Sequence, residues 1–390
     1  MPWCVRKCPY CDFNSHAIPD ELPADKYVKA LVADLEQDLP LVWGRPVQSI
    51  YFGGGTPSLF PAGLIASFLS DVRARLELRP DVEITLEANP GTIEHDSFTA
   101  YSQAGINRVS LGVQSFDNGL LKAIGRIHGR REIEQSLISL GLAGISNFNI
   151  DLMYGLPGQS PVQSRRDIEL AVNAGPAHIS FYQLTIEPNT LFAAKPPQLP
   201  VDDVAWQMQQ SGLDLLEVNG YRQYEISAYA LAGKQSRHNM NYWRFGDFLA
   251  IGAGAHGKIT TASEGRVRRF AKHRHPKRYL QGLESGDWCA ETRVLTDDEL
   301  IFEFFLNQLR LRDGLTIDDA DELSGVTLRP SGCRKHQDAN QKPKSKTAAE
   351  NHSRPRCIEP QLPYNTRIAY LPPPNHQKSR EISKNVMISG

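Results

Sequence analysis

Hydrophobic positions along residues 24–220 follow two alternating periods. Spacing of about 3.6 residues, typical of helices, occurs at 24–39, 61–76, 94–104, 130–143, 161–174 and 201–219. Short β-rich runs lie between these segments, at 47–52, 82–86, 108–113, 148–152 and 178–184. Strands that alternate with helices are typical of βα units around a parallel sheet. The pattern therefore predicts an α/β fold, in which the strands form a partial (β/α) barrel.

Small and polar residues follow these predicted strands in order. In a parallel barrel the working residues lie just beyond the carboxyl ends of the strands. The positions in question hold a glycine loop at 53–57, Glu87, Gln114, Asp151, and the pair Gln183 and Thr185. We therefore expect the functional site at this end of the barrel.

The pattern changes after residue 220, where we expect a smaller α+β region over 221–325. Thr296 is followed by three acidic residues, which indicates a capped helix start. Beyond residue 325 the chain is rich in Pro, Lys, Asn, His and Arg without apolar periodicity. We expect 326–390 to be disordered, or the product of a shifted reading frame. The predicted domains are thus 1–220, 221–325 and this tail.

Composition narrows the functional classes. The 390 residues carry a formal net charge of -1, which gives no electrostatic reason to expect a nucleic-acid partner. No apolar run approaches the roughly 20 residues that a transmembrane helix needs. The first residues lack the pattern of a secretory signal. We therefore expect a cytoplasmic protein, in which clustered cysteines are ligands rather than disulfides.

Three cysteines open the chain in the pattern C-x3-C-x2-C, at Cys4, Cys8 and Cys11. Three thiolates suit three irons of a [4Fe-4S] cubane and leave the fourth iron open to a small ligand. A zinc site completed by His16 is the alternative. Structural zinc usually has two residues between paired cysteines, and the first gap here is three. The pattern favours the cluster.

Several further segments are similar to the HemN/HemW group of radical S-adenosylmethionine (SAM) proteins. They are the loop 53–57 (GGGTP), 87–91 (EANPG), 112–116 (GVQSF), 125–128 (GRIH) and 151–158 (DLMYGLPG). With the cysteine motif, the resemblance covers residues 2–325 and is closest to the HemW branch. It implies a partial barrel of the radical SAM type that carries a [4Fe-4S] cluster and SAM.

The resemblance also implies which residues contact SAM, and their chemistry fits that role. Carboxylates and amides bind hydroxyl and amino groups, and an arginine can bind a carboxylate. Glycines let backbone approach a ligand closely. The implied residues are Tyr10, Gly54, Gly55, Thr56, Glu87, Gln114, Arg126 and Asp151. Taken singly, each could instead cap a helix or pair at a strand end.

A glycine-rich segment at 252–257 matches the dinucleotide pattern G-x-G-x-x-G. That reading requires a helix immediately after the glycines. Residues 258–265 instead indicate a strand and a turn. We expect these glycines to serve close backbone packing.

Residues 238–243 match the pattern H-N-x-x-Y-W of the HemW branch, which the resemblance links to haem binding. The imidazole of His238 could ligate haem iron. A histidine beside aromatic residues can also be a packed, hydrogen-bonded residue, and both interpretations stay open.

The resemblance leaves two functions open. The HemW branch implies a haem chaperone, whose partners are haem, haem-acceptor proteins and a one-electron donor such as a flavodoxin or ferredoxin. The related enzymes are oxygen-independent coproporphyrinogen III oxidases, which usually have a further cysteine where this chain has Phe13. That difference, together with His238, favours the chaperone. A zinc-stabilised α/β protein is a third hypothesis.

Family members also have a β-strand ahead of the cysteine motif, whereas this chain opens at the motif itself. We therefore expect a partial barrel that lacks its first strand, as a start codon placed too late would produce.

Overall fold

The structure is a computed structural model that describes residues 1–91, 96–261, 265–314 and 386–389. Its strands are β1 (Trp3–Cys4), β2 (His16–Ala17), β3 (Val47–Phe52), β4 (Leu78–Ala88), β5 (Arg108–Gln114), β6 (Phe148–Tyr154), β7 (His178–Gln183), β8 (Arg222–Glu225), β9 (Ala228–Ala230), β10 (Phe248–Ile251), β11 (His256–Thr261), β12 (Arg266–Lys272), β13 (Cys289–Val294) and β14 (Val386–Ser389).

The helices are α1 (Ala24–Asp38), α2 (Ala62–Arg75), α3 (Phe98–Ala104), α4 (Asn118–Ala123), α5 (Arg130–Leu142), α6 (Pro161–Asn173), α7 (Leu191–Ala194), α8 (Asp202–Val218), α9 (Arg237–Trp243), α10 (Pro276–Ser285) and α11 (Asp297–Gln308). Single 3-10 turns lie at Leu39–Leu41 and Pro57–Leu59. None of the helices within the described ranges is long and apolar enough to span a bilayer.

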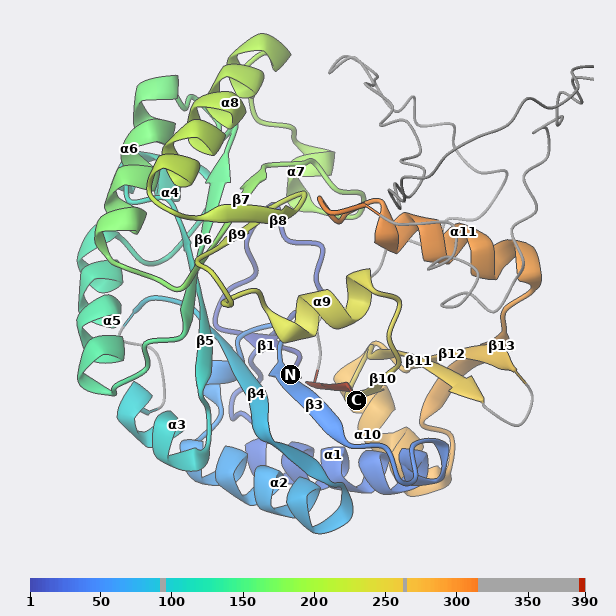
Figure 1. The fold of residues 1–390 in the computed structure, drawn as a ribbon. Helices are drawn as coiled ribbons and strands as arrows, with labels where there is room; N and C mark the ends of the chain where they lie inside the picture. Colours follow the sequence, from blue (N-terminus) through green and yellow to red (C-terminus); the bar gives the residue numbers. More distant parts are fainter. Residues whose placement is uncertain (92–95, 262–264, 315–385, 390) are drawn as a thin grey trace, which may run out of the picture. The chain divides into compact units, whose positions relative to one another are not determined.

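Twelve strands form one curved sheet in the order β13-β12-β11-β10-β14-β3-β4-β5-β6-β7-β9-β8. Strands β3 to β7 are parallel and joined through helices. Helices α1, α2, α3, α5, α6 and α8 follow the outer side of the sheet, and α9 lies on its inner side (Figure 1). This arrangement confirms the predicted α/β fold with a partial barrel.

The predicted elements agree closely with the observed ones. Each of the five β-rich runs coincides with a strand from β3 to β7, although β4 begins four residues earlier, and both β4 and β6 end two residues later, than predicted. The capped start at Thr296 is confirmed, since its hydroxyl accepts from the Glu299 amide and Glu299 reaches back to the Thr296 amide. Helix α4 was not predicted, because six residues are too short to show a period.

The predicted boundary at residue 220 falls within the large sheet, and the division into domains stays a prediction. The described residues on both sides of it belong to one compact unit. Strand β9 pairs with β7 across the boundary, so the sheet is continuous through it.

The predicted tail, 326–390, lies outside the described residues except for 386–389. Those four residues form β14, which pairs antiparallel with both β3 and β10. The expectation of disorder is wrong for them, because a short apolar run can fill a sheet position between two strands. Strand β1 pairs with β2 apart from the large sheet, so the described sheet has no strand from before the cysteine motif.

The glycines at 252–257 pack closely, as predicted, and no helix follows them. A Cβ on Gly254 would lie 2.4 Å from the Asn14 side chain, and one on Gly252 would lie 2.9 Å from the Tyr27 hydroxyl. Strand β11 follows, which confirms that this is not a dinucleotide-binding turn.

A buried ionic cluster joins α1 to β12 and α10. The Lys272 ammonium lies 2.7 Å from Asp34 and 2.8 Å from Asp38, and all three side chains are buried. The hydroxyl of Tyr279 donates to Asp34 at 2.6 Å. Burial raises the pKa of Asp38 to about 6, although Lys272 opposes the shift. The cluster is favourable only while each charge keeps its partner.

We predict that Lys272→Met lowers the free energy of unfolding by about 3 to 5 kcal/mol, because it leaves two carboxylates buried without a cation. Burial already raises the pKa of Asp38 above that in the unfolded chain, and loss of the Lys272 charge removes the group that opposes this shift. The defect should therefore be largest at neutral pH and shrink as the pH falls. Urea unfolding at pH 7.5 and 5.5 measures it. Lys29→Met is the control, since Lys29 is exposed; equal losses in both variants would contradict the prediction.

Candidate functional site

A cavity of about 280 Å³ opens at the carboxyl ends of β3 to β6. All three cysteines of the motif line it, and so does every residue predicted to contact SAM. The set comprises Cys4, Cys8, Cys11, Tyr10, Gly54, Gly55, Thr56, Glu87, Gln114, Arg126 and Asp151. The fold therefore brings together residues that lie up to 147 positions apart in the sequence (Cys4 to Asp151). His238 is not part of this lining.

The three cysteines carry free, partly buried thiols. Each thiol has a polar neighbour. The Thr56 hydroxyl donates to Cys4 Sγ at 3.4 Å, Arg126 Nη1 donates to Cys8 Sγ at 3.7 Å, and Ser15 Oγ lies 3.9 Å from Cys11 Sγ. Burial raises the pKa of Cys4 to about 11 and also raises that of Cys11. Such thiols stay protonated until a bound metal supplies compensating charge.

A chain of side-chain hydrogen bonds connects two of the thiols. Asn89 stands at its centre, where its Nδ2 donates to Thr56 Oγ1 at 2.9 Å and its Oδ1 accepts from Arg126 Nη2 at 2.6 Å. Because Thr56 contacts Cys4 and Arg126 contacts Cys8, one amide fixes donors to two sulfurs. Such second-shell contacts orient ligands and tune a metal centre.

The glycine loop allows backbone to approach backbone. Gly55 N donates to Met1 O at 2.7 Å, and a Cβ on Gly55 would lie 2.4 Å from Trp3 O. Gly54 has a φ of 119°, which other residues rarely adopt. Its amide donates to Glu87 Oε2 at 3.1 Å.

The other oxygen of Glu87 is also held. The Tyr51 hydroxyl donates to Glu87 Oε1 at 2.6 Å. Burial, and then Glu87 itself, raise the pKa of Tyr51 well above its usual range, so the phenol remains a donor. Glu87 is partly exposed on the pocket wall, where a ligand can reach it.

Gln114 ends β5 with a φ of 69°, which is rare outside glycine. Its Oε1 accepts from the Tyr182 hydroxyl at 2.8 Å, which helps to hold the strained residue against the pocket. Strained backbone of this kind often lies at functional sites.

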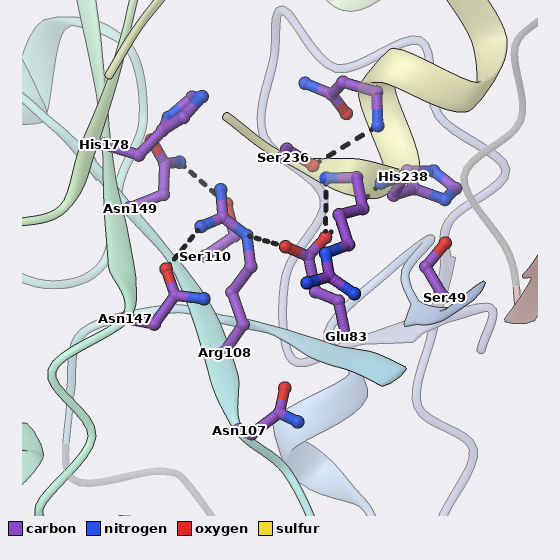
Figure 2. A network of polar contacts seen from close by, with 12 residues as sticks. Ser49, Glu83, Asn107, Arg108, Ser110, Asn147, Asn149, His178, Ser236 and His238 are labelled. Atoms are coloured by element: carbon purple, nitrogen blue, oxygen red, sulfur yellow. Dashed lines mark hydrogen bonds and ion pairs between the residues drawn. The ribbon is translucent and has the colours of Figure 1, made fainter. Parts of the chain in front are cut away.

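Asp151 is supported from below by a buried polar network. Asn149 Nδ2 donates to Asp151 Oδ1 at 2.8 Å, and the Ser110 hydroxyl donates to Oδ2 at 3.3 Å. The network continues from Asn149 to the His178 ring at 2.6 Å and on to the Tyr224 hydroxyl at 2.8 Å. Figure 2 shows Ser110, Asn149 and His178 near one another.

Tyr10 lies in the cysteine loop and lines the pocket, so it can contact a ligand there. Its ring also packs 6.4 Å from that of Phe192, and the Phe192 amide donates to Pro9 O at 3.0 Å. Helix α7 thereby braces the loop that carries the cysteines.

The zinc alternative gains no support from the geometry. His16 Nε2 lies 3.1 Å from Asn14 Oδ1, and the His16 ring packs 5.3 Å from that of His275. Among the described residues no three His, Cys, Asp or Glu side chains converge tightly enough to hold a single ion. The thiols fit a cubane better, because each thiolate there binds a different iron.

His238 lies apart from the pocket, on the inner side of the sheet. It is 5% exposed, and its ring stacks on Tyr51 at 4.1 Å with Tyr242 edge-on at 4.9 Å. In this structure His238 is thus a packed residue, which is the alternative to haem ligation. Its assignment as a haem ligand stays a prediction.

Comparison with known proteins agrees with this geometry. The radical SAM superfamily model matches residues 1–171, and the HemN C-terminal domain model matches 295–331. Coproporphyrinogen III oxidase (HemN) from Escherichia coli shares the fold, with a TM-score of 0.71 at 23% identity over 84% of this chain and 77% of that one. Fold, cysteine pocket and superfamily match define the class as radical SAM proteins.

Similar sequences indicate the family within the radical SAM class to which the chain belongs. Heme chaperone HemW of Escherichia coli (strain K12) is 51% identical over 80% of this chain and 81% of its own length. Heme chaperone HemW of Haemophilus influenzae is 46% identical, over 84% and 85% respectively. A bovine mitochondrial relative, radical S-adenosyl methionine domain-containing protein 1, is 34% identical over 81% and 73%. The chain belongs to the HemW family of radical SAM proteins, and this class implies a [4Fe-4S] cluster and SAM.

Three residues that contribute to the site were not predicted from the sequence: Tyr51, Asn89 and Tyr182. Asn89 stands inside a recognised motif, so its polarity at a strand end was a usable signal. Tyr51 and Tyr182 act through their hydroxyls on Glu87 and Gln114, which depends on the packing of neighbouring strands. No sequence signal distinguishes them from core aromatics.

We predict that Asn89→Ala weakens retention of a reconstituted [4Fe-4S] cluster about tenfold, because the donors to Cys4 and Cys8 lose their common partner. Iron and sulfide content during challenge with a chelator measures the effect. Asn219→Ala is the control, since Asn219 bonds only within the exposed end of α8. Equal rates of iron loss in the two variants would count against the role of Asn89.

A second prediction concerns His128, which lines the pocket. Burial, and then the neighbouring Arg126, lower its pKa to about 3. The histidine pKa in the unfolded chain is near 6.5, so between about pH 6.5 and 3 the unfolded chain binds more protons than the folded one. The free energy of unfolding therefore decreases as the pH is lowered through that range. His128→Gln should remove about 2 kcal/mol of this loss between pH 7.5 and 5. Unfolding at both pH values tests it against exposed His275→Gln; parallel pH curves for wild type and His128→Gln would refute it.

Proposed function

We propose that the protein is a haem chaperone that holds a [4Fe-4S] cluster and SAM and passes haem to acceptor proteins. The observation that carries the proposal is the assembly of all three cysteines and all eight predicted SAM residues on one pocket, in a chain of the HemW family. Bound together, a cluster and SAM supply one-electron chemistry, for which the protein provides orientation and shelter from water.

The pocket residues divide this work. Cys4, Cys8 and Cys11 hold three irons, while Thr56 and Arg126 donate to two of the sulfurs. Glu87 and Asp151 present carboxylate oxygens, which accept from hydroxyl or amino groups of SAM. Protein donors hold both carboxylates, and both residues line the pocket.

Haem is proposed to bind at α9, with His238 as an axial ligand. In the described conformation the His238 ring is closed off between Tyr51 and Tyr242. Ligation therefore requires α9 to move away from β3. A haem-acceptor protein and a one-electron donor such as a flavodoxin or ferredoxin complete the proposal, in the cytoplasm, where reduced thiols suit cluster assembly.

The oxidase is the alternative within the same class. It would act as an enzyme and remove carboxyl groups from coproporphyrinogen III. Phe13 lines the pocket at the position where the oxidases usually have a further cysteine. This difference favours the chaperone.

We predict that anaerobically reconstituted protein binds one haem per chain and does not decarboxylate coproporphyrinogen III when supplied with SAM and reductant. His238→Ala should weaken haem binding at least tenfold, because it removes the axial ligand. Haem titration followed in the Soret region and product analysis measure both.

His275→Ala is the matched control, because His275 is an exposed histidine outside α9. Turnover of the porphyrinogen would overturn the chaperone in favour of the oxidase. Unchanged haem affinity in His238→Ala would remove His238 as the ligand while leaving the pocket proposal intact.

A further inference from the structure

Tyr51 on β3 connects α9 to the SAM pocket. One face of its ring stacks on His238 at 4.1 Å, with 17° between the ring planes. Its hydroxyl donates to Glu87 Oε1 at 2.6 Å. Tyr51 itself does not line the pocket, so it can affect a ligand only through Glu87.

Glu87 is held at two points. Tyr51 binds one carboxylate oxygen, and the amide of Gly54 binds the other at 3.1 Å. Loss of the tyrosine contact removes the hydroxyl donor that fixes Oε1. The direction in which Glu87 presents its lone pairs to the cavity thus depends on Tyr51.

The position of Tyr51 depends in turn on α9. The ring is 6% exposed, and a phenol in a stack has little freedom while its partner is fixed. The His238 ring also packs against Tyr242 in an edge arrangement, with 4.9 Å between ring centroids. The three aromatic side chains form one packed row that ends at Glu87.

Helix α9 is anchored where the row begins. Glu83 Oε1 accepts from the amides of Arg237 and His238 at 3.0 and 3.3 Å. The Arg237 guanidinium pairs with Asp81 at 2.8 Å. Figure 2 shows Glu83 beside the start of α9, with His238 directed away from the Arg108 side of the network.

We propose that Tyr51, seated on His238, is a positioning residue that orients Glu87 for SAM, so that α9 belongs to the SAM site although it touches no ligand. The inference rests on the proposed binding of SAM in this pocket. It extends that function by assigning a task to a helix outside the cavity.

The competing explanation is that the stack only fills the core. In that case, loss of the hydroxyl would lower stability without changing ligand affinity. Tyr221 provides a matched comparison, because its buried hydroxyl donates to Pro176 O at 2.7 Å and neither residue lines the pocket.

The experiment measures the SAM dissociation constant of the cluster-loaded full chain by anaerobic equilibrium dialysis, with iron content and Tm for every variant. We expect Tyr51→Phe to raise the dissociation constant about tenfold, since it keeps the stack and loses only the hydrogen bond to a charged group. Tyr221→Phe should leave it within twofold of wild type. His238→Phe should keep SAM affinity, because an aromatic ring remains, whereas His238→Ala should weaken it several-fold.

Glu87→Ala distinguishes failure of the positioning role of Tyr51 from failure of the proposed SAM site. If Glu87→Ala weakens SAM binding and Tyr51→Phe does not, the positioning role is wrong and the pocket stands. If Glu87→Ala binds SAM like wild type, the proposed SAM site falls, and the inference falls with it. A Tm loss in Tyr51→Phe equal to that in Tyr221→Phe, without any change in affinity, also overturns the inference.

Discussion

The close contact between the start of the chain and the glycine loop after β3 determines where the cysteines lie. Gly55 N and Thr56 N donate to the carbonyls of Met1 and Trp3 at 2.7 and 2.8 Å. The Trp3 ring is buried against Tyr27, with 4.8 Å between centroids. Cys4 follows directly and meets the Thr56 hydroxyl. A side chain at position 55 would separate these segments, and the first thiol would leave the pocket.

The polar groups of the site surround the cysteines that this contact positions. Burial raises the pKa of the Cys4 and Cys11 thiols. Their thiolate forms therefore need a bound cation or hydrogen-bond donors to offset the negative charge. Thr56 and Arg126 provide such donors, and Asn89 holds both in place. The pocket is thus organised for a group that brings positive charge to its sulfurs, as an iron–sulfur cluster does.

Much of this could be predicted from sequence. Each strand from β3 to β7 is a short β-rich run with a polar or glycine residue at or near its carboxyl end, so the order of the strands places those residues at one edge. The pocket residues could therefore be predicted from their positions at strand ends, their chemical types and the family resemblance.

Other features depend on distances that no local pattern contains. Strand β14 joins β3 and β10 across more than 100 residues, and its four residues carry no period that distinguishes them from the tail before them. The Tyr51 hydroxyl reaches Glu87 because β3 and β4 pair in parallel with Tyr51 opposite Thr85. One shift in register would direct the phenol elsewhere.

The burial of His238 changes how the two parts of the proposed function relate. A haem ligand seated in the open would act independently of the SAM pocket. Here the imidazole lies against Tyr51, and Tyr51 donates to Glu87, so under the proposal a ligand that withdraws the ring from the stack would also disturb one of the hydrogen bonds that hold Glu87. Linkage is reciprocal for binding free energies, so SAM that favours the held Glu87 also favours the closed position of α9. If haem and SAM bind as proposed, the aromatic row is the structural connection between the two sites.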